Sequence, residues 1–302
     1  MRRWILTVCI LVSLAWTEAG AELTVATYNV QNYTLADRRV DGVFRRGYPK
    51  PEAEKSALRA VLRSLNADVL ILQEMGTLSY LEELQRDLSA EGIRYPYAGV
   101  VNAADTDRHL AFLSRIAPEH VVEHTDLALT YFGKREPVKR GLLELRLRSG
   151  GQRLVLFGVH LKSRYTDRPD DPESKLRRAG EAVAIRDRIF QRVSDDEWYV
   201  ILGDFNDVKS SRPIQAILRR GKTPLSFLTV AADTRGEAWT YRFARDDVYS
   251  RVDHILVSPA LQALLGTRRA EILDLAEVDV ASDHRPVKLR LPVFGGENAG
   301  SP

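Results

Sequence analysis

Cysteine is almost absent from this chain of 302 residues, because the single one, Cys9, lies close to the N-terminus. The sequence after residue 21 contains no cysteine, so no disulfide can contribute to its stability. A strong charge of one sign is also missing, since 44 Lys and Arg residues face 41 Asp and Glu residues, a net charge of +3. This balance is compatible with a phosphate-bearing substrate but does not require one. Beyond the N-terminal region, no apolar run has the length of a membrane-spanning helix.

The N-terminal region has the pattern of a secretory signal peptide. Arg2 and Arg3 give it a positively charged start, an apolar stretch follows at residues 4–16, and Ala19-Gly20-Ala21 supplies the small residues of a cleavage site. We therefore expect residues 1–21 to be removed and the mature protein to be secreted or periplasmic. Residues 22–293 suit one large domain, and the glycine-containing residues 294–302 are expected to form a flexible tail.

Apolar patterns predict an α/β protein. Helical spacing is found at residues 52–65, 77–88, 175–191 and 212–219. Short apolar or alternating runs predict strands at residues 23–30, 68–74, 109–114, 141–147, 154–160, 199–204, 252–257 and 286–291. Strands alternate with helices early in the chain, whereas a hairpin-like pair occurs later. This mixture indicates two sheets packed face to face with helices outside, rather than a uniform parallel barrel.

Polar residues occur where these apolar runs end. The clearest example is Gly203-Asp204-Phe205-Asn206-Asp207, which directly follows the run Trp198-Tyr199-Val200-Ile201-Leu202. Similar positions at or within other strands are taken by Asn29, Glu74, His160, Asp253, Asp283 and His284. Each of them alone could be a turn former, a solvated strand end or a structural histidine. Together they favour one polar site at the ends of a shared sheet, suited to a divalent cation and a phosphate.

Six segments, in this order along the chain, resemble the endonuclease/exonuclease/phosphatase superfamily of deoxyribonuclease-like phosphoesterases. They are Thr27-Tyr28-Asn29-Val30, Leu72-Gln73-Glu74, Gly158-Val159-His160-Leu161, Leu202-Gly203-Asp204-Phe205-Asn206-Asp207, Arg251-Val252-Asp253-His254-Ile255-Leu256 and Ser282-Asp283-His284-Arg285-Pro286-Val287. The resemblance extends over about residues 23–292. It implies that residues 22–293 form a catalytic domain, a two-sheet α/β sandwich flanked by helices in four layers, with a divalent metal at the sheet edges.

The resemblance also implies which residues bind the metal and the substrate. Glu74, Asn29 and Asp283 would bind or orient the ion, with Mg²⁺ expected and Mn²⁺ or Ca²⁺ as alternatives. Whether one or two metals act is left open. Arg140 and Lys162 are expected to contact the phosphate of the substrate.

The resemblance implies five catalytic residues, two of which act as a pair. Asp204 would orient or deprotonate the attacking water, and Asn206 would hold that water or a phosphate oxygen. His160 would donate to the phosphate from the opposite side. His284, paired with Asp253, would act as a base or as a charged phosphate contact.

Several branches of the family fit this sequence poorly. Inositol-phosphate phosphatases usually carry a Pro-Ala-Trp-Cys-Asp-Arg block where this chain has Tyr249-Ser250-Arg251-Val252-Asp253-His254. Abasic-site endonucleases place a tyrosine at the position of His160, and secreted deoxyribonucleases usually carry a disulfide that this sequence cannot form. Sphingomyelinases tend to have an apolar hairpin for lipid docking, and no hairpin with paired exposed aromatics is expected here. His254 is interpreted as structural, and Arg108 is expected at the rim of the site.

The connection between Asn29 and the first helix gives the best indication of the substrate. It interleaves cations with aromatic residues, namely Tyr33, Arg38, Arg39, Phe44, Arg45, Arg46, Tyr48 and Lys50. A groove that follows a nucleic-acid backbone and stacks bases has this mixture, although a solvated loop is the alternative. We therefore expect a monomeric nuclease with little sequence preference, acting on DNA or RNA without a stable protein partner. The alternatives are a phosphatase, a lipid phosphodiesterase on the same site, and a catalytically silent binding module.

Overall fold

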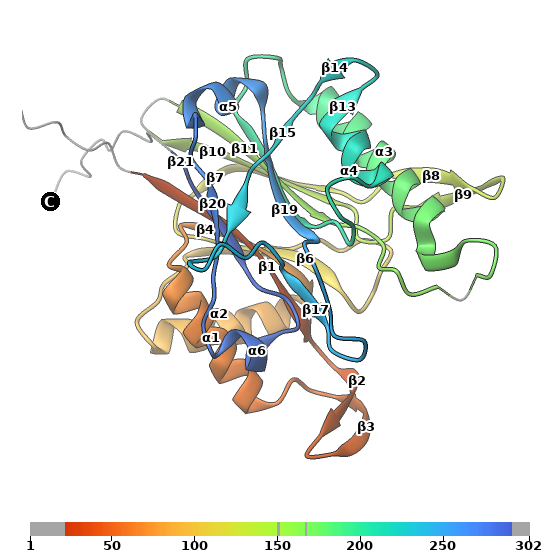
Figure 1. Ribbon diagram of the computed structural model, residues 1–302. Helices are drawn as coiled ribbons and strands as arrows, with labels where there is room; N and C mark the ends of the chain where they lie inside the picture. The colour runs from red at the N-terminus through yellow and green to blue at the C-terminus, as the bar shows by residue number, and fades with distance from the viewer. Residues whose placement is uncertain (1–21, 150–151, 167, 292–302) are drawn as a thin grey trace, which may run out of the picture.

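The computed structural model describes residues 22–149, 152–166 and 168–291, so the expected signal peptide and C-terminal tail lie outside the described residues. Two large sheets form the centre of the protein (Figure 1). The first has seven strands in the order β16 (Ala231–Ala232), β20 (Ala270–Ile272), β21 (Val287–Leu291), β1 (Leu23–Tyr33), β4 (Val69–Met75), β6 (His109–Ser114) and β5 (Tyr97–Val100). The second has six, in the order β15 (Phe227–Leu228), β19 (Asp253–Val257), β12 (Tyr199–Asp204), β11 (Gln152–His160), β10 (Leu142–Ser149) and β7 (Pro118–His124).

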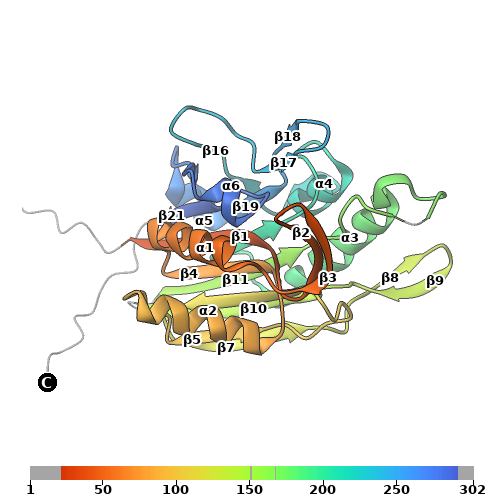
Figure 2. The same cartoon turned by 90° about the horizontal axis from the view of Figure 1, so that it is seen from below.

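Three apolar clusters arrange these sheets and the helices in four layers. One cluster fills the space between the two sheets. A second packs three helices on the outer face of the first sheet: α1 (Glu52–Leu65), α2 (Leu78–Ala90) and α6 (Val278–Ala281). A third packs α3 (Lys175–Arg192) and α4 (Arg212–Leu218) on the outer face of the second sheet, and Figures 1 and 2 show the two groups on opposite sides. The predicted two-sheet α/β sandwich flanked by helices is therefore confirmed.

Helix α1 illustrates why the regular elements could be predicted. Its apolar residues recur with helical spacing and are buried at Leu58, Val61, Leu62 and Leu65. The helix ends because Asn66 adopts a left-handed conformation, with φ of 46°, and its main-chain N–H donates to the carbonyl oxygen of Leu62. The predicted boundaries, residues 52–65, agree with the structure.

The connection over residues 31–51 contains a β-hairpin that the sequence pattern did not indicate. Strands β2 (Ala36–Val40) and β3 (Val43–Tyr48) flank a two-residue loop in which Asp41 and Gly42 have φ of 51° and 78°. An Asp-Gly loop with positive φ at both positions is typical of a tight hairpin turn. The two strands have no buried face, so their sequences lack the apolar alternation by which strands are recognised.

Other short elements also lie outside the sequence-based assignment. They are the helix α5 (Pro259–Leu265), the 3₁₀ helix η1 (Pro172–Ser174) and the hairpins β8 (Ala128–Tyr131)–β9 (Lys134–Pro137), β13 (Arg219–Arg220)–β14 (Thr223–Pro224) and β17 (Tyr241–Phe243)–β18 (Val248–Ser250). The β2–β3 and β17–β18 hairpins project at the same end of the protein (Figures 1 and 2). In the described part of the chain, no helix combines the length and the apolar character needed to cross a bilayer.

Candidate active site

The strand ends converge on one edge shared by both sheets. β1 runs parallel to β4 in the first sheet, and β11 runs parallel to β12 in the second. β21 and β19 run antiparallel to β1 and β12, so their first residues lie beside those carboxyl ends. Asn29 Nδ2 donates across the two sheets to Asp204 Oδ2 at 3.1 Å. Ser282 Oγ donates to the main-chain oxygen of Asn29 at 2.8 Å, which brings the segment before β21 to the same place.

The backbone of β1 and β4 is irregular at this edge. The sequence suggested that the first strand ends at Asn29, but β1 continues to Tyr33 through a register shift against β4. Gln31, Asn32 and Glu74 have φ of 47°, 51° and 60°. Non-glycine residues in this region cost roughly 1–3 kcal/mol each and cluster at functional sites. The main-chain N–H of Asn32 donates to Glu74 Oε2 at 3.0 Å, so the two irregular segments support each other.

His284 and Asp253 form the predicted pair. His284 Nδ1 lies 2.8 Å from Asp253 Oδ2, and both side chains are buried. Burial alone would lower the pKa of His284, but the charges of Asp253 and Asp204 raise it well above its ordinary value. The ring is therefore an imidazolium near neutral pH, with one N–H directed at Asp253. Its Nε2 lies 4.0 Å from Asp204 Oδ2.

Asp204 is an enclosed carboxylate at the centre of the edge. Its Oδ2 accepts from the side-chain amides of Asn29 and Asn206, each at 3.1 Å, and its Oδ1 accepts from the main-chain N–H of Asn206 at 2.8 Å. Burial, followed by the negative charge of Asp253, raises the pKa of Asp204 to about 7. A carboxylate with this pKa can take up and release a proton near neutral pH.

His160 lies behind Asp204 and is almost fully buried. Its Nε2 is 3.6 Å from Asp204 Oδ2, which is longer than a hydrogen bond, and its Nδ1 has no hydrogen-bond partner among the described residues. Burial, and then the charge of Arg140, lower the pKa of His160 well below its ordinary value, so the ring is neutral. Direct donation from His160 to a phosphate stays a prediction.

A cleft of about 490 Å³ opens over this edge. Seven of the ten predicted site residues line it, namely Glu74, Arg140, Lys162, Asp204, Asn206, Asp283 and His284. Arg108, expected at the rim, lines it as well. Asn29, His160 and Asp253 lie behind this lining, where each approaches Asp204 or His284. The structure thus brings all ten residues together, while their roles stay predictions.

The acidic residues fit a divalent cation near Glu74 and Asp283. Burial, opposed in part by His284, raises the pKa of Asp283, and the charge of Glu74 raises it further, so the two carboxylates repel each other. A cation between them would relieve that repulsion. Ligand atoms of Asp204, Asp253 and His284 also lie within 4.8 Å of one another. In that second group His284 Nδ1 and Asp253 Oδ2 are already hydrogen-bonded to each other, which makes it a poorer metal site.

Among the cations of the cleft, Arg140 is the one best positioned to bind an anion. Its side chain is buried and its Nε lies 2.8 Å from Asp105 Oδ2, but its Nη1 has no hydrogen-bond partner among the described residues. A buried guanidinium nitrogen without a partner, at the wall of a cleft, can bind an anionic oxygen. Lys162 lies on the same cleft, and burial followed by the charge of Arg140 lowers its pKa to about 8.

Lys139, Tyr165 and Tyr241 are among the cleft residues that were not identified from the sequence. Tyr241 of β17 places its ring centroid 4.8 Å from that of His284, and Lys139 and Tyr165 also line the cleft. Lys139 could have been found as the neighbour of Arg140, whereas Tyr241 and Tyr165 stand in a short hairpin and a loop without a motif. His254, interpreted as structural, is buried with its Nε2 2.9 Å from the main-chain oxygen of Asp207, outside the lining of the cleft.

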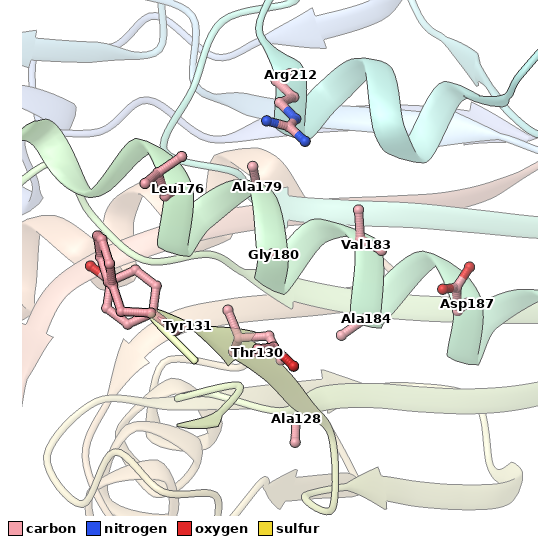
Figure 3. A pocket seen from close by; sticks show the side chains of 12 residues that line it. Ala128, Thr130, Tyr131, Leu176, Ala179, Gly180, Val183, Ala184, Asp187 and Arg212 are labelled. Atoms are coloured by element: carbon pink, nitrogen blue, oxygen red, sulfur yellow. The ribbon is translucent and has the colours of Figure 1, made fainter. Parts of the chain in front are cut away.

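A second cavity, of about 520 Å³, lies between α3 and the β8–β9 hairpin (Figure 3). Its lining includes Ala179 and Val183 of α3, Thr130 of β8, and the charged residues Asp187 and Arg212. Only one carboxylate and one guanidinium stand among mostly apolar or neutral groups there. We therefore place the chemistry in the cleft over the strand ends.

Comparison with protein families gives one match that spans most of the chain. The model of the family described as Endonuclease/Exonuclease/phosphatase matches residues 26–284. The match includes every site residue predicted from the sequence. Among the curated proteins compared by sequence, none matches the chain.

Solved structures of this fold are similar along nearly the whole chain. Sphingomyelinase C from Streptomyces griseocarneus has 18% sequence identity and a TM-score of 0.62, covering 90% of this chain and 99% of that one. A mutant of beta toxin from Staphylococcus aureus with bound magnesium ions has 15% identity and a TM-score of 0.62, covering 90% and 100%. Truncated TDP2 from Caenorhabditis elegans has 16% identity and a TM-score of 0.59, covering 90% and 98%. At these identities the likeness shows the fold alone.

Proposed function

We propose that this chain, which belongs to the endonuclease/exonuclease/phosphatase family and is a phosphoesterase, hydrolyses phosphodiester bonds of DNA or RNA with little sequence preference. The observation that carries the proposal is the cationic surface that continues from the cleft. Arg108, Lys139, Arg140 and Lys162 line the cleft itself. The β2–β3 hairpin then adds the exposed side chains of Arg39, Arg45 and Arg46.

The hairpin is attached directly to the cleft. Arg38 Nη2 donates to the main-chain oxygen of Asn32 at 2.9 Å, and Lys50 Nζ donates to that of Gln31 at 3.2 Å. Asn32 and Gln31 both line the cleft. A row of cations that extends from a phosphate site along a projecting hairpin matches a polymer with a charge on every unit, rather than a substrate with a single phosphate.

The family is dependent on divalent metals, and we propose Mg²⁺ held by Glu74 and Asp283, with Asn29 orienting the site. When bound, such an ion neutralises charge on the phosphate and makes a water molecule more acidic. Asn29 contributes indirectly, because its Oδ1 accepts from the main-chain N–H of Gln31 at 3.0 Å while its Nδ2 holds Asp204.

The chain's own residues can then move the proton and bind the phosphate. Asp204 is fixed by Asn29 and Asn206, and its pKa of about 7 suits a base that accepts the proton of the attacking water. The imidazolium of His284 and the guanidinium of Arg140 supply positive charge to the phosphate oxygens. Each of these groups is held by a partner that is buried or only partly exposed, so little reorganisation is needed when the substrate binds.

A lipid phosphodiesterase is the second candidate, and one observation favours it. No hairpin with paired exposed aromatics was expected from the sequence, but β17–β18 exposes both Phe243 and Tyr249 beside the cleft residue Tyr241. Phe44, 56% exposed near the turn of β2–β3, adds a further apolar group at the same end. Such groups can enter a lipid surface. We rank this function second because a zwitterionic headgroup, with one phosphate, would not contact the arginines of the β2–β3 hairpin.

We propose further that the protein acts outside the cytoplasm and as a monomer. The N-terminal pattern at residues 1–21 supports export. The three apolar clusters are formed within one chain, which supports a monomer. Fractionation of cells that express the full sequence, with light scattering of the purified product, tests both statements.

The function is tested by incubating the purified protein with plasmid DNA, RNA, sphingomyelin vesicles and inositol phosphates, with Mg²⁺ or with EDTA. We expect Mg²⁺-dependent cleavage of at least one of the two nucleic acids that exceeds turnover of sphingomyelin and inositol phosphates by at least tenfold. Preferred turnover of sphingomyelin would instead establish the second candidate. Absence of turnover on all four, with Mg²⁺, Mn²⁺ and Ca²⁺, would contradict the nuclease proposal.

A further inference from the structure

An exposed tyrosine ring lies at the cleft, and its main-chain oxygen is hydrogen-bonded by two side chains. Tyr165 is 81% exposed and lines the cleft, yet its main-chain oxygen accepts from Ser174 Oγ, a buried hydroxyl, at 3.0 Å. Lys162 Nζ also donates to that oxygen and lies 5.9 Å from the centre of the Tyr165 ring. An aromatic ring left in solvent is available to a ligand, and an anchored main chain reduces the part of the loop that binding must order.

The segment before Tyr165 is fixed from the other side by two buried charges of α3. Glu181 Oε2 accepts from the main-chain N–H of Lys162 at 2.8 Å, and Arg178 Nη1 donates to the main-chain oxygen of Lys162 at 3.2 Å. Arg178 Nε also donates to Asp207 Oδ2 at 2.9 Å. The loop that carries Tyr165 and the loop that follows Asp204 are therefore both bonded to α3.

A second ring lies on the same cleft. Tyr241 is half-buried, and its ring packs against His284 with an angle of 41° between the planes. The cleft thus combines two tyrosines with the cations Arg108, Arg140 and Lys162. Proteins that bind single strands use this combination, in which cations follow the backbone and aromatic rings stack on bases. In a duplex the base faces are stacked on one another and cannot reach such rings.

We propose that the substrate is a single-stranded polynucleotide, with a base next to the scissile phosphate stacked on Tyr165. This inference rests on the proposed nuclease function and specifies the form of nucleic acid that the site accepts. DNA and RNA present the same stacking chemistry, so both belong to the test.

The test compares four substrates of equal length with the purified full chain and Mg²⁺: a DNA strand, the same strand in a duplex, the RNA of the same sequence, and a base-free strand of the same phosphate backbone. We expect the DNA or RNA strand to be cleaved at least tenfold faster than the duplex and the base-free strand. Stacking contributes roughly 1–3 kcal/mol per base, so Tyr165→Ala should lower kcat/KM on the base-bearing strand by about 5- to 150-fold, mainly through KM. The loss on the base-free strand should be much smaller.

Two variants complete the design. Tyr165→Phe keeps the ring and should restore most of the activity, and Tyr97→Ala removes an exposed tyrosine of β5, outside the lining of the cleft, and should match the parent protein. Equal rates on strand and duplex, or equal losses for Tyr165→Ala on base-bearing and base-free strands, would overturn this inference while leaving the nuclease function intact. Turnover of sphingomyelin or inositol phosphates without cleavage of any polynucleotide would overturn both.

Discussion

His284 gains its charge from Asp253, so the two residues should act as one unit. The carboxylate, 2.8 Å from Nδ1, favours the protonated ring and fixes which nitrogen faces the cleft. Without Asp253 the pKa of the buried ring would fall, and without His284 the buried carboxylate would lose its partner. Asp253 Oδ1 already has no hydrogen-bond partner among the described residues, so nothing else holds this side chain in place of His284.

We predict that Asp253→Asn and His284→Ala each slow turnover by roughly 10²-fold or more, the range for positioned acid–base groups. The double variant should be little slower than the slower single variant, because both changes remove the same interaction. The measurement is kcat for the three variants at saturating Mg²⁺, with melting temperatures to detect loss of folding. If the two losses multiply while folding is unchanged, the residues act independently.

Glu74 should be the carboxylate on which metal-dependent activity depends. Glu74→Gln keeps the shape of the side chain and the acceptor for the main-chain N–H of Asn32 but removes the charge, so we predict loss of Mg²⁺ binding and of activity with an intact fold. Calorimetric titration with Mg²⁺ measures the binding directly. Glu82→Gln, on the exposed side of α2, is the matched control and should behave as the parent protein. Activity of Glu74→Gln within a few-fold of the parent would show that another group holds the ion.

The residues that meet at the candidate site could be predicted because they are joined to apolar strands. Asn29, Glu74, His160 and Asp204 follow hydrophobic runs whose pairing in a sheet brings their ends together. Tyr165 has no such signal, because its place at the cleft depends on contacts of a loop with α3 and η1. The contribution of Ser174 and Arg178 to that loop is a tertiary effect that periodicity cannot reveal.

Strand β12 reaches the site only because residue 203 is glycine. Gly203 has φ of 152°, and a Cβ there would lie 1.9 Å from the main-chain oxygen of Val159 on β11. We predict that Gly203→Ala destabilises the fold by about 3 kcal/mol, since overpacking against backbone cannot be relieved by a rotamer change. Activity should fall further than the folded fraction, because Asp204 would move with the displaced strand. Urea unfolding and kcat measure the two effects.

Gly180→Ala is the control for this substitution. The added Cβ on α3 would approach Leu129 Cδ1 at 2.5 Å, but that atom is the end of a side chain that can turn away. Alanine also favours the helix by about 1 kcal/mol relative to glycine. We expect near-parental stability, and a loss as large as that of Gly203→Ala would show that the clash with backbone is not the decisive factor.

The exposed arginines of β2–β3 should contribute affinity that depends on salt. Replacing Arg45 and Arg46 with serine should weaken binding of polynucleotides and reduce the slope of log K against log salt by up to about 0.7–0.9 for each phosphate group that the variant no longer neutralises. The matched control replaces Arg148 and Arg153, which face each other at the end of the β10–β11 pair remote from His160. An unchanged slope for the Arg45 and Arg46 variant would show that the hairpin does not follow the backbone of the substrate.

The β2–β3 hairpin is an element that the sequence pattern did not predict. The two large sheets and the long helices were found because burial of one face imposes a period on their residues. The hairpin buries neither face, so only the turn residues Asp41 and Gly42 marked it. Elements that lie on the surface and bury no face show no such periodicity in their sequences, and several of them surround the site.

At the scale of the whole molecule, a cluster of charged side chains surrounds the buried Glu144, outside the lining of the cleft. Glu144 of β10 is fully buried and accepts from His124 Nε2 at 2.7 Å, from Arg146 Nε at 2.7 Å and from Arg192 Nε at 2.9 Å. These partners belong to β7, to β10 itself and to α3, so one carboxylate joins the second sheet to its helical layer. Burial alone would raise the pKa of Glu144, but hydrogen bonds from His124, Arg192 and Arg146 lower it to about 2.

This cluster should give the protein a pH-dependent stability with a defined sign. A carboxyl group whose pKa is lower in the folded than in the unfolded protein stabilises the fold fully above its ordinary pKa of 4.5 and loses that contribution as the pH falls toward about 2. Because Arg192 is partly exposed to solvent, we expect a contribution of about 1–3 kcal/mol rather than the full value for an enclosed pair.

Glu144→Gln should therefore be less stable than the parent protein at pH 7, and the difference should shrink between pH 4.5 and pH 2. Urea unfolding of both proteins at pH 7, 4 and 3 measures it, and a difference that stays constant over this range would assign the loss to packing instead of charge. Glu144 is not among the residues that line the cleft, so the folded variant should keep parental kcat at pH 7.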